Sequence, residues 1–299
     1  MHKDEPKRQH HVPKAYLKNF CHDGTKLEVL DMHSGKMYSS NIDDIAVEKD
    51  FYTLEKLDDP YVWERGYGEG IEPEMAETLR SIIAKASLPV RDNTYILTKD
   101  DKVRLAFIMV IQMLRGKQCR EHMRKIFRKE LPLVIEQVRS SLGGFNEKQL
   151  TLIKAVGNDE FYFKDSISSV TVDPDRIINY ASLLGQYSFI IYRLQGNAEF
   201  VTSDNPVMFV NYATNDPTPF RNGLLQPTTI VYFPIAPKLM LSAIHPSVSS
   251  SITAPIDGIL IDLFVPNENS FIVDINRNQM QQCFRQVYAK SKKTIVNIY

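Results

Sequence analysis

Residues 187–194, YSFIIYRL, decide the fold class, because they begin a series of short segments rich in β-branched and aromatic residues. Such segments predict β-strands when Asn, Pro and Gly separate them. We expect the series to continue at residues 199–202, 207–211, 228–235, 239–244 and 259–264. Helical patterns precede it. The sequence therefore predicts an α+β protein whose helical N-terminal half packs on a mainly antiparallel or mixed β-sheet in the C-terminal half.

Residues 71–184 are predicted to be helical. Pro73 is placed to open a helix that runs to about Leu88, and Asp173-Pro174 begins a shorter one. Between them, Thr98 and Asp101 resemble a capping box for the longest helix, which we expect to reach about Glu130. This helix contains the run LAFIMVIQML at residues 105–114, so we expect it to be buried.

The two ends of the chain have patterns of their own. Residues 10–54 predict a short helix after Pro13 and a β-hairpin of residues 26–31 and 36–40, and residues 55–70 predict an exposed loop. A helix at residues 276–290 and a strand at residues 294–299 are expected to close a strand-rich part, residues 185–299. We predict a single domain over residues 1–299, with residues 1–9 as a flexible tail.

Composition excludes several classes of protein. The formal net charge is zero, so no global field recruits nucleic acid or an anionic membrane. Three scattered cysteines are too few for a disulfide framework or a zinc site. The first ten residues have no apolar core typical of a secretory signal, and no apolar run is long enough to span a bilayer. We therefore expect a cytoplasmic protein without a membrane partner.

Charge is uneven along the chain. Residues 41–80 hold twelve acidic and four basic residues, whereas residues 102–139 hold ten basic and three acidic ones. Two interpretations are open. The regions pack against each other or are solvated faces. Alternatively, the basic helix at residues 102–139 binds nucleic acid or another anion, although it lacks the interleaved aromatic residues of single-strand sites.

Several sequence blocks resemble one bacterial family. They are HHVPKAYLKNF at residues 10–20, VEKDFY at 47–52, QMLR at 112–115, FVTSDNP at 200–206 and FPI at 233–235. Together they are similar to the family of unknown function DUF-4238 and cover nearly the whole chain. The resemblance implies a shared fold and no established reaction, so the chemistry must come from the residues themselves.

Gln112 is the polar exception in the apolar run, and a buried amide must find hydrogen-bond partners. Arg115 lies one helical turn later on the same side, followed by Cys119 and His122. One interpretation is that Gln112 and Arg115 hold loops against the helix. The other is that they line a pocket and bind an anionic or amide-bearing ligand.

Carboxylates suggest a divalent cation as cofactor. Glu48 and Asp50 alternate along a predicted strand and point to one face, and Asp204 lies in a turn between strands. His11, just before the fixed backbone of Pro13, is a candidate proton carrier. The alternative is that these residues cap helices and form turns. The spacing matches no standard zinc or nuclease motif.

The tetrapeptide Ser203-Asp204-Asn205-Pro206 is the second candidate site, and turn formation alone also explains it. Ser203 lacks the flanking glycines of a nucleophile elbow, and no phosphate-binding glycine loop is present. We hypothesise a metal-assisted hydrolase, a phosphodiesterase or nuclease. Its metal ligands are Glu48, Asp50 and Asp204, its catalytic residues His11, Asp204 and Arg115, and its ligand-binding residues Gln112, Arg115, Ser203 and Asn205. The alternative is a non-catalytic protein- or ligand-binding module.

Overall fold

The computed structural model describes residues 7–158, 160–171, 173–250, 255–264 and 270–299. Its largest element is a mixed six-stranded sheet of order β5-β11-β6-β10-β9-β8. Strand β11 pairs with β6 in parallel, and the other neighbours are antiparallel. The strands are β5 (Thr94–Tyr95), β6 (Ser188–Gln195), β8 (Met208–Asn211), β9 (Thr229–Ala236), β10 (Leu239–Ile244) and β11 (Ile259–Phe264).

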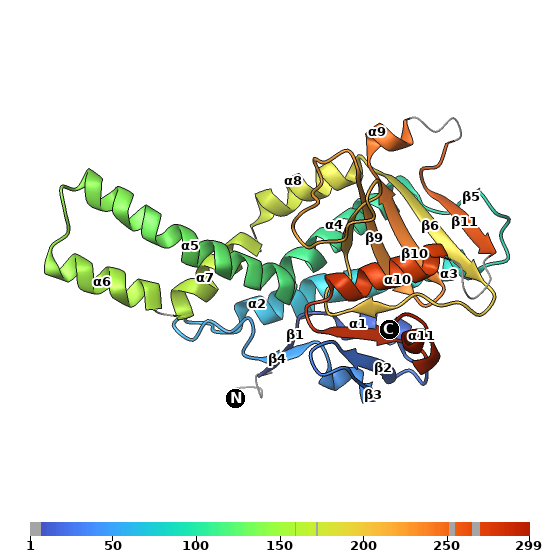
Figure 1. Cartoon of the computed structure of the whole chain (residues 1–299), viewed down its shortest axis with the longest axis horizontal. Coiled ribbons are helices and arrows are strands. Elements are labelled where there is room, and N and C mark those ends of the chain that lie inside the picture. Colours follow the sequence, from blue (N-terminus) through green and yellow to red (C-terminus); the bar gives the residue numbers. More distant parts are fainter. Residues whose placement is uncertain (1–6, 159, 172, 251–254, 265–269) are drawn as a thin grey trace.

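Alternation along these strands creates two buried faces. Side chains such as Phe189, Phe233 and Leu241 pack against α3 (Glu72–Ser87), α4 (Lys99–Arg115) and α8 (Pro174–Gly185). The opposite face, including Met240, contacts Ile272 and Ile275 of α10 (Ser270–Gln282). The large sheet therefore lies between helical layers, as Figure 1 shows. A short helix, α9 (Pro246–Ser249), follows β10.

A second sheet lies beside α10 and has the order β3-β2-β12-β7. Its apolar face packs against α10 and the C-terminal helix (Figure 1). Because β7 pairs with β12, the segment between strands β6 and β8 of the large sheet is attached to the C-terminal part of the chain. The elements are β2 (Lys26–Asp31), β3 (Lys36–Asn41), β7 (Thr202–Ser203), β12 (Gln286–Ala289) and α11 (Lys292–Val296).

The N-terminal segment forms a small layer under α3 and α4. A two-stranded sheet pairs its first strand with residues 47–49, and Val12, Tyr16 and Phe20 enter the main core. A π-helical segment continues directly into α3. The elements are β1 (Arg8–His10), α1 (Lys14–Leu17), η1 (Lys18–Phe20), η2 (Ile42–Asp44), β4 (Val47–Lys49), α2 (Val62–Arg65) and the π-helix η3 (Gly66–Ile71).

Three helices project from this body as an arm: α5 (Lys117–Ser141), α6 (Glu147–Asn158) and α7 (Glu160–Thr171) (Figure 1). The arm begins at Gly116, whose ψ of 150° breaks the helix between α4 and α5. A Cβ atom added to Gly116 would lie 3.4 Å from the Gln112 carbonyl oxygen and 3.9 Å from Asn205 Oδ1. The break therefore lies where another segment of the chain approaches the helix closely.

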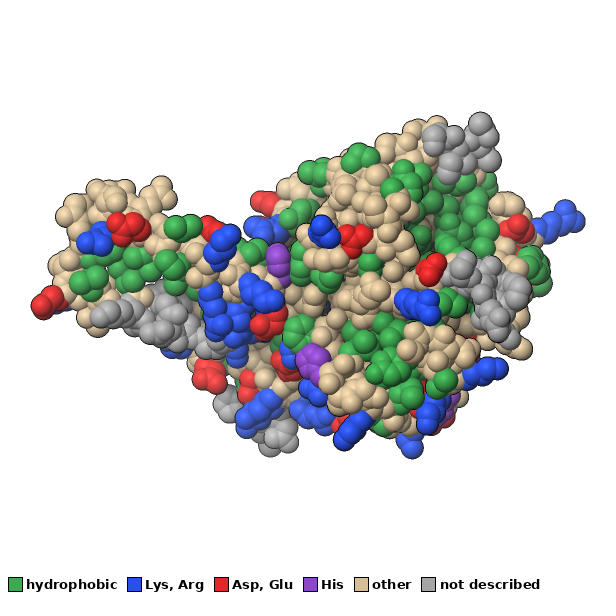
Figure 2. Space-filling model, in the orientation of Figure 1, with side chains coloured by type: hydrophobic (Ala, Val, Ile, Leu, Met, Phe, Trp, Pro, Cys, Tyr) green, Lys and Arg blue, Asp and Glu red, His purple; other side chains and the backbone are tan. Residues whose placement is uncertain are grey.

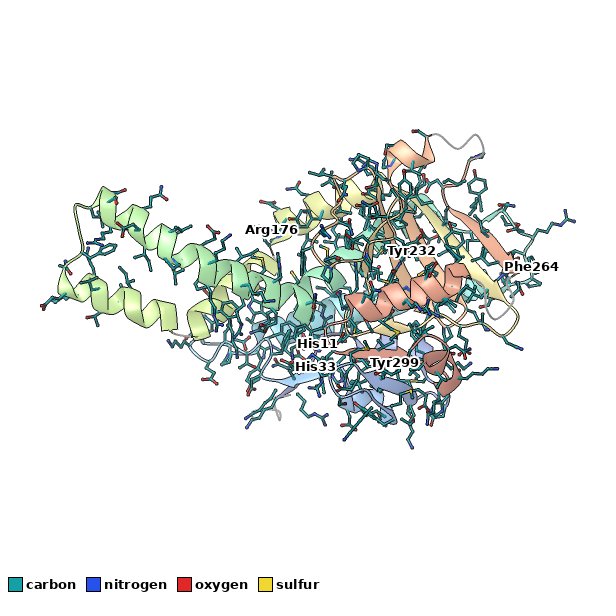
Figure 3. The ribbon with its side chains drawn as sticks, viewed as in Figure 1. His11, His33, Arg176, Tyr232, Phe264 and Tyr299 are labelled. Atoms are coloured by element: carbon teal, nitrogen blue, oxygen red, sulfur yellow. The ribbon has the colours of Figure 1, made fainter. Side chains whose placement is uncertain are left out.

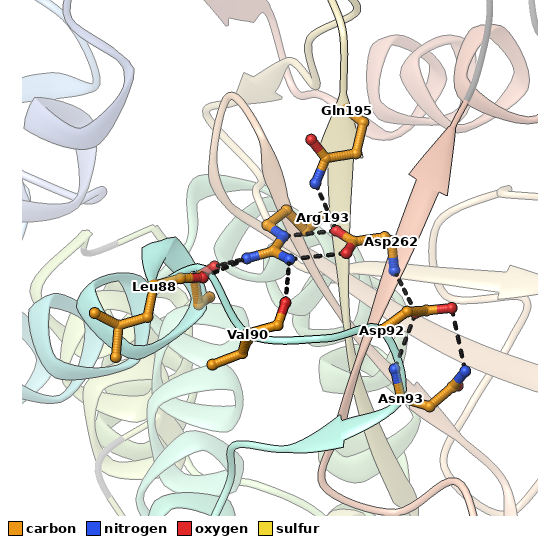
Figure 4. A network of polar contacts seen from close by, with 8 residues as sticks. Leu88, Val90, Asp92, Asn93, Arg193, Gln195 and Asp262 are labelled. Atoms are coloured by element: carbon orange, nitrogen blue, oxygen red, sulfur yellow. Dashed lines mark hydrogen bonds and ion pairs between the residues drawn. The ribbon is translucent and has the colours of Figure 1, made fainter.

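Arg193 on β6 attaches the end of α3 to the large sheet (Figure 4). Its guanidinium donates to Asp262 of β11 through Nε at 2.6 Å and Nη2 at 2.8 Å. Nη1 donates to the carbonyls of Ala86 and Leu88, both at 2.8 Å. Carbonyls in the last turn of a helix lack intrahelical partners. The Arg193 side chain therefore caps α3 and fixes its position on the sheet.

The α+β class is confirmed, but the division into halves is wrong. Strands β1 to β5 precede or alternate with helices, and α10 and α11 surround β12. The physical reason is that the N-terminal strands complete a sheet with β12 from the other end of the chain. The mixed character of the main sheet agrees with the prediction.

Several local predictions need correction. Residues 62–71 are helical and not a loop, and the helix expected to reach about Glu130 is two helices, α4 ending at Arg115 and α5 continuing to Ser141. The chain ends in α11 and not in a strand. Of the predicted tail, residues 1–6 lie outside the described residues, whereas Arg8 and Gln9 belong to β1, where the Gln9 side chain bonds Thr53 and is fully buried.

Candidate functional site

The C-terminal end of α4 holds the N-terminal segment in place. Gln112 Nε2 donates to the His11 carbonyl at 3.1 Å, and Arg115 Nη2 donates to the His10 carbonyl at 2.8 Å. Gln112 and Arg115 are only 1% and 3% exposed. The prediction that Gln112 is buried and hydrogen-bonded is therefore confirmed. Its contact is a loop carbonyl, which agrees with the interpretation that the pair holds a loop against the helix.

Arg115 lies in an aromatic enclosure. Its guanidinium carbon lies 4.3 Å from the Tyr67 ring centroid, and Nε donates to the Tyr52 hydroxyl at 3.2 Å. Nη2 also pairs with Glu72 at 2.9 Å. Nη1 is buried without a hydrogen-bond partner among the described residues. These neighbours hold the charged Arg115 guanidinium in place, and the guanidinium contributes a positive potential to the groups around it.

His11 is a neutral, buried imidazole (Figure 3). Burial lowers the pKa of His11 to about 3, and Lys117 and Arg115 add to that shift. Its ring packs on Phe51 at 5.5 Å, and Nδ1 lacks a partner within the described part of the chain. His11 thus lies close to Gln112 and Arg115, and its side chain is almost fully buried.

Asp204 is bound to backbone. Its carboxylate accepts from the amides of Phe284 at 2.8 Å, Arg285 at 2.8 Å and Gln286 at 2.9 Å. Burial raises the pKa of Asp204 to about 6, and the three N–H donors and Lys117 oppose that shift. The chain turn from α10 into β12 is therefore organised around one carboxylate.

The neighbours of Asp204 are tied to α10. Ser203 Oγ accepts from Gln279 Nε2 at 2.5 Å and from the Asn205 amide at 3.0 Å. Asn205 Nδ2 donates to the Gln282 carbonyl at 2.9 Å, and Asn205 Oδ1 has no donor among the described residues. In the tetrapeptide, Asn205 Oδ1 is thus a hydrogen-bond acceptor that no described residue uses.

The predicted metal ligands each have a different environment. Glu48 forms an ion pair with Lys117, and Asp50, in a left-handed conformation with φ of 53°, lies 3.9 Å from Lys49 Nζ. Lys117 also interacts electrostatically with Asp204 and His11. In the described ranges no group of three His, Cys, Asp or Glu residues is arranged to hold a metal ion. The divalent cation and the hydrolase reaction stay predictions.

The acidic and basic regions are joined by ion pairs. Three of them link residues 41–80 to residues 102–139: Glu72–Arg115 at 2.9 Å, Glu74–Arg104 and Glu48–Lys117. This agrees with the interpretation that the two regions pack against each other. Lys and Arg side chains also gather where the arm leaves the body (Figure 2). Binding of nucleic acid or another anion there stays a prediction.

A cavity of about 470 Å³ lies between the α4–α5 junction, α8, β8 and the loop that follows β8. Apolar side chains form most of its wall: Met113, Leu114, Met123, Leu183, Val207, Phe209 and Leu224. Arg176 of α8 also lines it, near the base of the arm (Figure 3). The cavity places an apolar space directly beside Asn205.

Unused polar groups converge on this cavity. Gln118, His122 and Tyr180 line it, and none of these side chains has a hydrogen-bond partner in the described part of the chain. The His122 ring stacks on Phe220 with centroids 3.8 Å apart. Phe220 has a φ of 61°, which costs a bulky residue on the order of 1–3 kcal/mol. Such strain clusters at ligand-binding sites.

Sequence reasoning found part of this site. Cys119 and His122, which follow Arg115 on the predicted helix, do line the cavity, while Arg115 is buried away from it. Arg176, Tyr180 and Phe220 were missed, because nothing local distinguishes them from surface residues. Only the fold brings α8 and the loop after β8 to α5.

Comparison with known proteins identifies the family. The model of the family described as "Protein of unknown function (DUF4238)" matches residues 8–293, so the chain belongs to that family. Comparisons with curated proteins and with solved structures found no match. Within the described residues, no helix has the length and apolar character that crossing a membrane requires.

Proposed function

We propose that the chain is a ligand-binding module that takes a small, mainly apolar molecule carrying a hydroxyl or amide group. The observation that carries the proposal is the cavity of about 470 Å³, where four unused polar groups face apolar walls. Small-molecule sites commonly combine an apolar pocket of about 300–1,000 Å³ with a few polar groups that fix orientation. Asn205 Oδ1 would accept a ligand proton, and Gln118 would supply both donor and acceptor.

The position of the cavity supports the same function. Its floor, with Asn205, is tied to α10, whereas its outer wall is the loop that contains Phe220. A rigid floor and a strained aromatic wall suit ligand exchange, because the wall can relax when the ligand changes. The predicted role of Asn205 in ligand binding is kept here, while Ser203 supports Asn205 from behind.

Thermal melting with indole, n-octanol and octanamide tests the proposal. A ligand that binds the native state at a hundred times its Kd adds about 2.7 kcal/mol of stability. We expect saturable stabilisation by octanamide or n-octanol, weakened by Gln118→Leu and abolished by Leu183→Trp, which fills the cavity. Ile178→Trp is the matched control, because Ile178 is exposed on the same helix and is not part of the cavity wall. Equal stabilisation of the Leu183→Trp protein would contradict the proposal.

A further inference from the structure

A second opening of about 460 Å³ lies on another part of the molecule, and its lining shares no residue with the cavity. One side consists of Arg8, His10, Lys14 and Asp43 from β1, α1 and η2. The other side consists of Glu64, Gly68 and Glu72 from α2, η3 and α3. We call this opening the polar cleft.

A π-helix shapes one wall of the polar cleft. The helical run from α2 through η3 into α3 places Glu64, Gly68 and Glu72 at intervals of four residues. Gly68 has free space around it, since a Cβ atom added there would meet no atom within 4 Å. π-Helical turns are rare and occur often at functional sites. Here the turn leaves open backbone between two carboxylates.

The charges of the cleft are matched except for one. Arg8 pairs with Asp44 at 2.8 Å, Lys14 with Asp43 at 3.0 Å, and Arg115 beneath the cleft with Glu72 at 2.9 Å. Glu64 has no hydrogen bond or ion pair within the described ranges. A half-buried carboxylate without a partner is costly, so the cleft lacks one positive charge.

His10 supplies a second acceptor. Its Nε2 lies 3.2 Å from the Ile42 carbonyl, and a carbonyl oxygen can only accept, so Nε2 carries the proton. Burial lowers the pKa of His10, which keeps the ring neutral at neutral pH. The remaining nitrogen, Nδ1, is then an acceptor. The cleft therefore offers acceptors at both walls.

We infer that the polar cleft binds an organic ammonium group, with Glu64 as its counter-ion and His10 Nδ1 as a further acceptor. An ammonium offers one positive charge and several N–H donors, which is what the cleft lacks. The group can belong to a free small amine or to the amino terminus of a peptide. This inference is independent of the proposed function, because it concerns a different opening.

The pH dependence of binding follows from the surroundings of Glu64. Burial raises the pKa of Glu64 to about 7, Glu72 adds to the shift and Arg115 opposes it. Arg8, His10, Lys14 and Asp43 face Glu64 across the cleft, and Tyr52 lies near it from below. Glu64 is therefore protonated at pH 5.5 and ionised at pH 8. Affinity for an alkylammonium should rise as pH increases through 7, since it stays charged up to about pH 10, whereas a peptide α-ammonium loses its proton near pH 8 and is compared at pH 7.

Isothermal titration calorimetry with n-propylammonium chloride tests the inference. We expect Kd at pH 8 to be at least about tenfold lower than at pH 5.5, and Glu64→Gln to raise it by at least about tenfold, which is about 1.4 kcal/mol. Glu69→Gln is the matched control, because Glu69 is exposed on η3, in the same continuous helical run as Glu64, but lies outside the cleft. It should bind as the wild type does.

Further titrations separate the effect of the ligand's charge from that of its N–H donors. They also distinguish a free amine from a peptide amino terminus. Tetramethylammonium has the same charge without N–H groups and should bind at least about tenfold more weakly. Triglycine and N-acetyl-triglycine compare a peptide ammonium with a blocked one; binding of triglycine alone assigns the site to peptide termini as well. No heat with any amine at pH 8, or equal affinity in the folded Glu64→Gln protein, overturns the inference.

Discussion

Replacing Asp204 by alanine tests whether this residue is structural or catalytic. Three backbone amides, those of residues 284–286, donate to its carboxylate at 2.8–2.9 Å. Asp204 is 3% exposed, so water does not replace the lost acceptor freely. An unsatisfied buried polar group costs about 1–3 kcal/mol. Allowing for partial hydration of the turn, we expect Asp204→Ala to lower the free energy of unfolding by about 4 kcal/mol.

Asp204→Asn refines this test. Its amide oxygen keeps one acceptor, but its NH₂ group would face N–H donors of Arg285 and Gln286. We expect a loss of about 2–3 kcal/mol for this variant. Asp50→Asn is the control, because Asn tolerates the left-handed conformation at this position, and we expect a change within about 0.5 kcal/mol.

The assay is urea unfolding at pH 7.5 followed by circular dichroism, with equal slopes required for the comparison. A loss below about 1 kcal/mol for Asp204→Ala would refute the structural role, because three broken bonds cannot cost so little in a buried turn. In that case Asp204 would be free to serve as the predicted metal ligand or catalytic residue.

Three further predictions follow from the same contacts. Asp262→Asn should destabilise the protein by about 2 kcal/mol in urea unfolding, because it breaks the half-buried ion pair with Arg193; an unchanged midpoint would show that this ion pair is dispensable. The pKa of His11 is about 3 in the folded protein and 6.5 unfolded, so its contribution to stability is complete above pH 6.5 and is lost as pH falls towards 3. A His11→Gln protein should lose less stability over that range, and parallel pH profiles would argue against it. Melting with magnesium, manganese, calcium and zinc should show no native-state stabilisation, since Asp204 and Glu48 already have partners; a shift abolished by Asp50→Asn would restore the metal hypothesis.

The sequence predicted elements whose stability is local. The capping box of Thr98 and Asp101 forms as expected, and so does the start of α8 after Asp173. The burial of Gln112 also followed from its apolar neighbours, since a helix that is apolar on all sides has only the core to occupy. These predictions need only residues within a few turns of one another.

Features that depend on distant partners were not predictable in this way. α4 ends before Gly116, at the point where Asn205 from far along the chain lies beside the helix, and nothing in the apolar run signals this. The acceptor role of Asp204 depends on amides about eighty residues away. Glu64 was assigned to a loop, so its place on α2, directly before the π-helix η3, and its interaction with Arg115 could not be inferred.

The segments that resemble the family are mutual contacts in the structure. Tyr16 of the first block stacks on Phe233 at 5.1 Å and donates to the Pro234 carbonyl at 2.6 Å. Tyr52 of the second block bonds Arg115 of the third. This network explains why separated blocks occur together without requiring that any of them be catalytic.

The same network of contacts extends to both the polar cleft and the apolar cavity. Arg115 holds the His10 carbonyl, and His10 lines the polar cleft. On the other side, α10 holds Asn205, whose Oδ1 approaches Gly116 and which lines the apolar cavity. Because His10 and Asn205 both lie beside the C-terminal end of α4, the two openings share one helix end as a support. The buried polar residues therefore form a scaffold for the two proposed binding sites, each of which has its chemistry at the edge of the network.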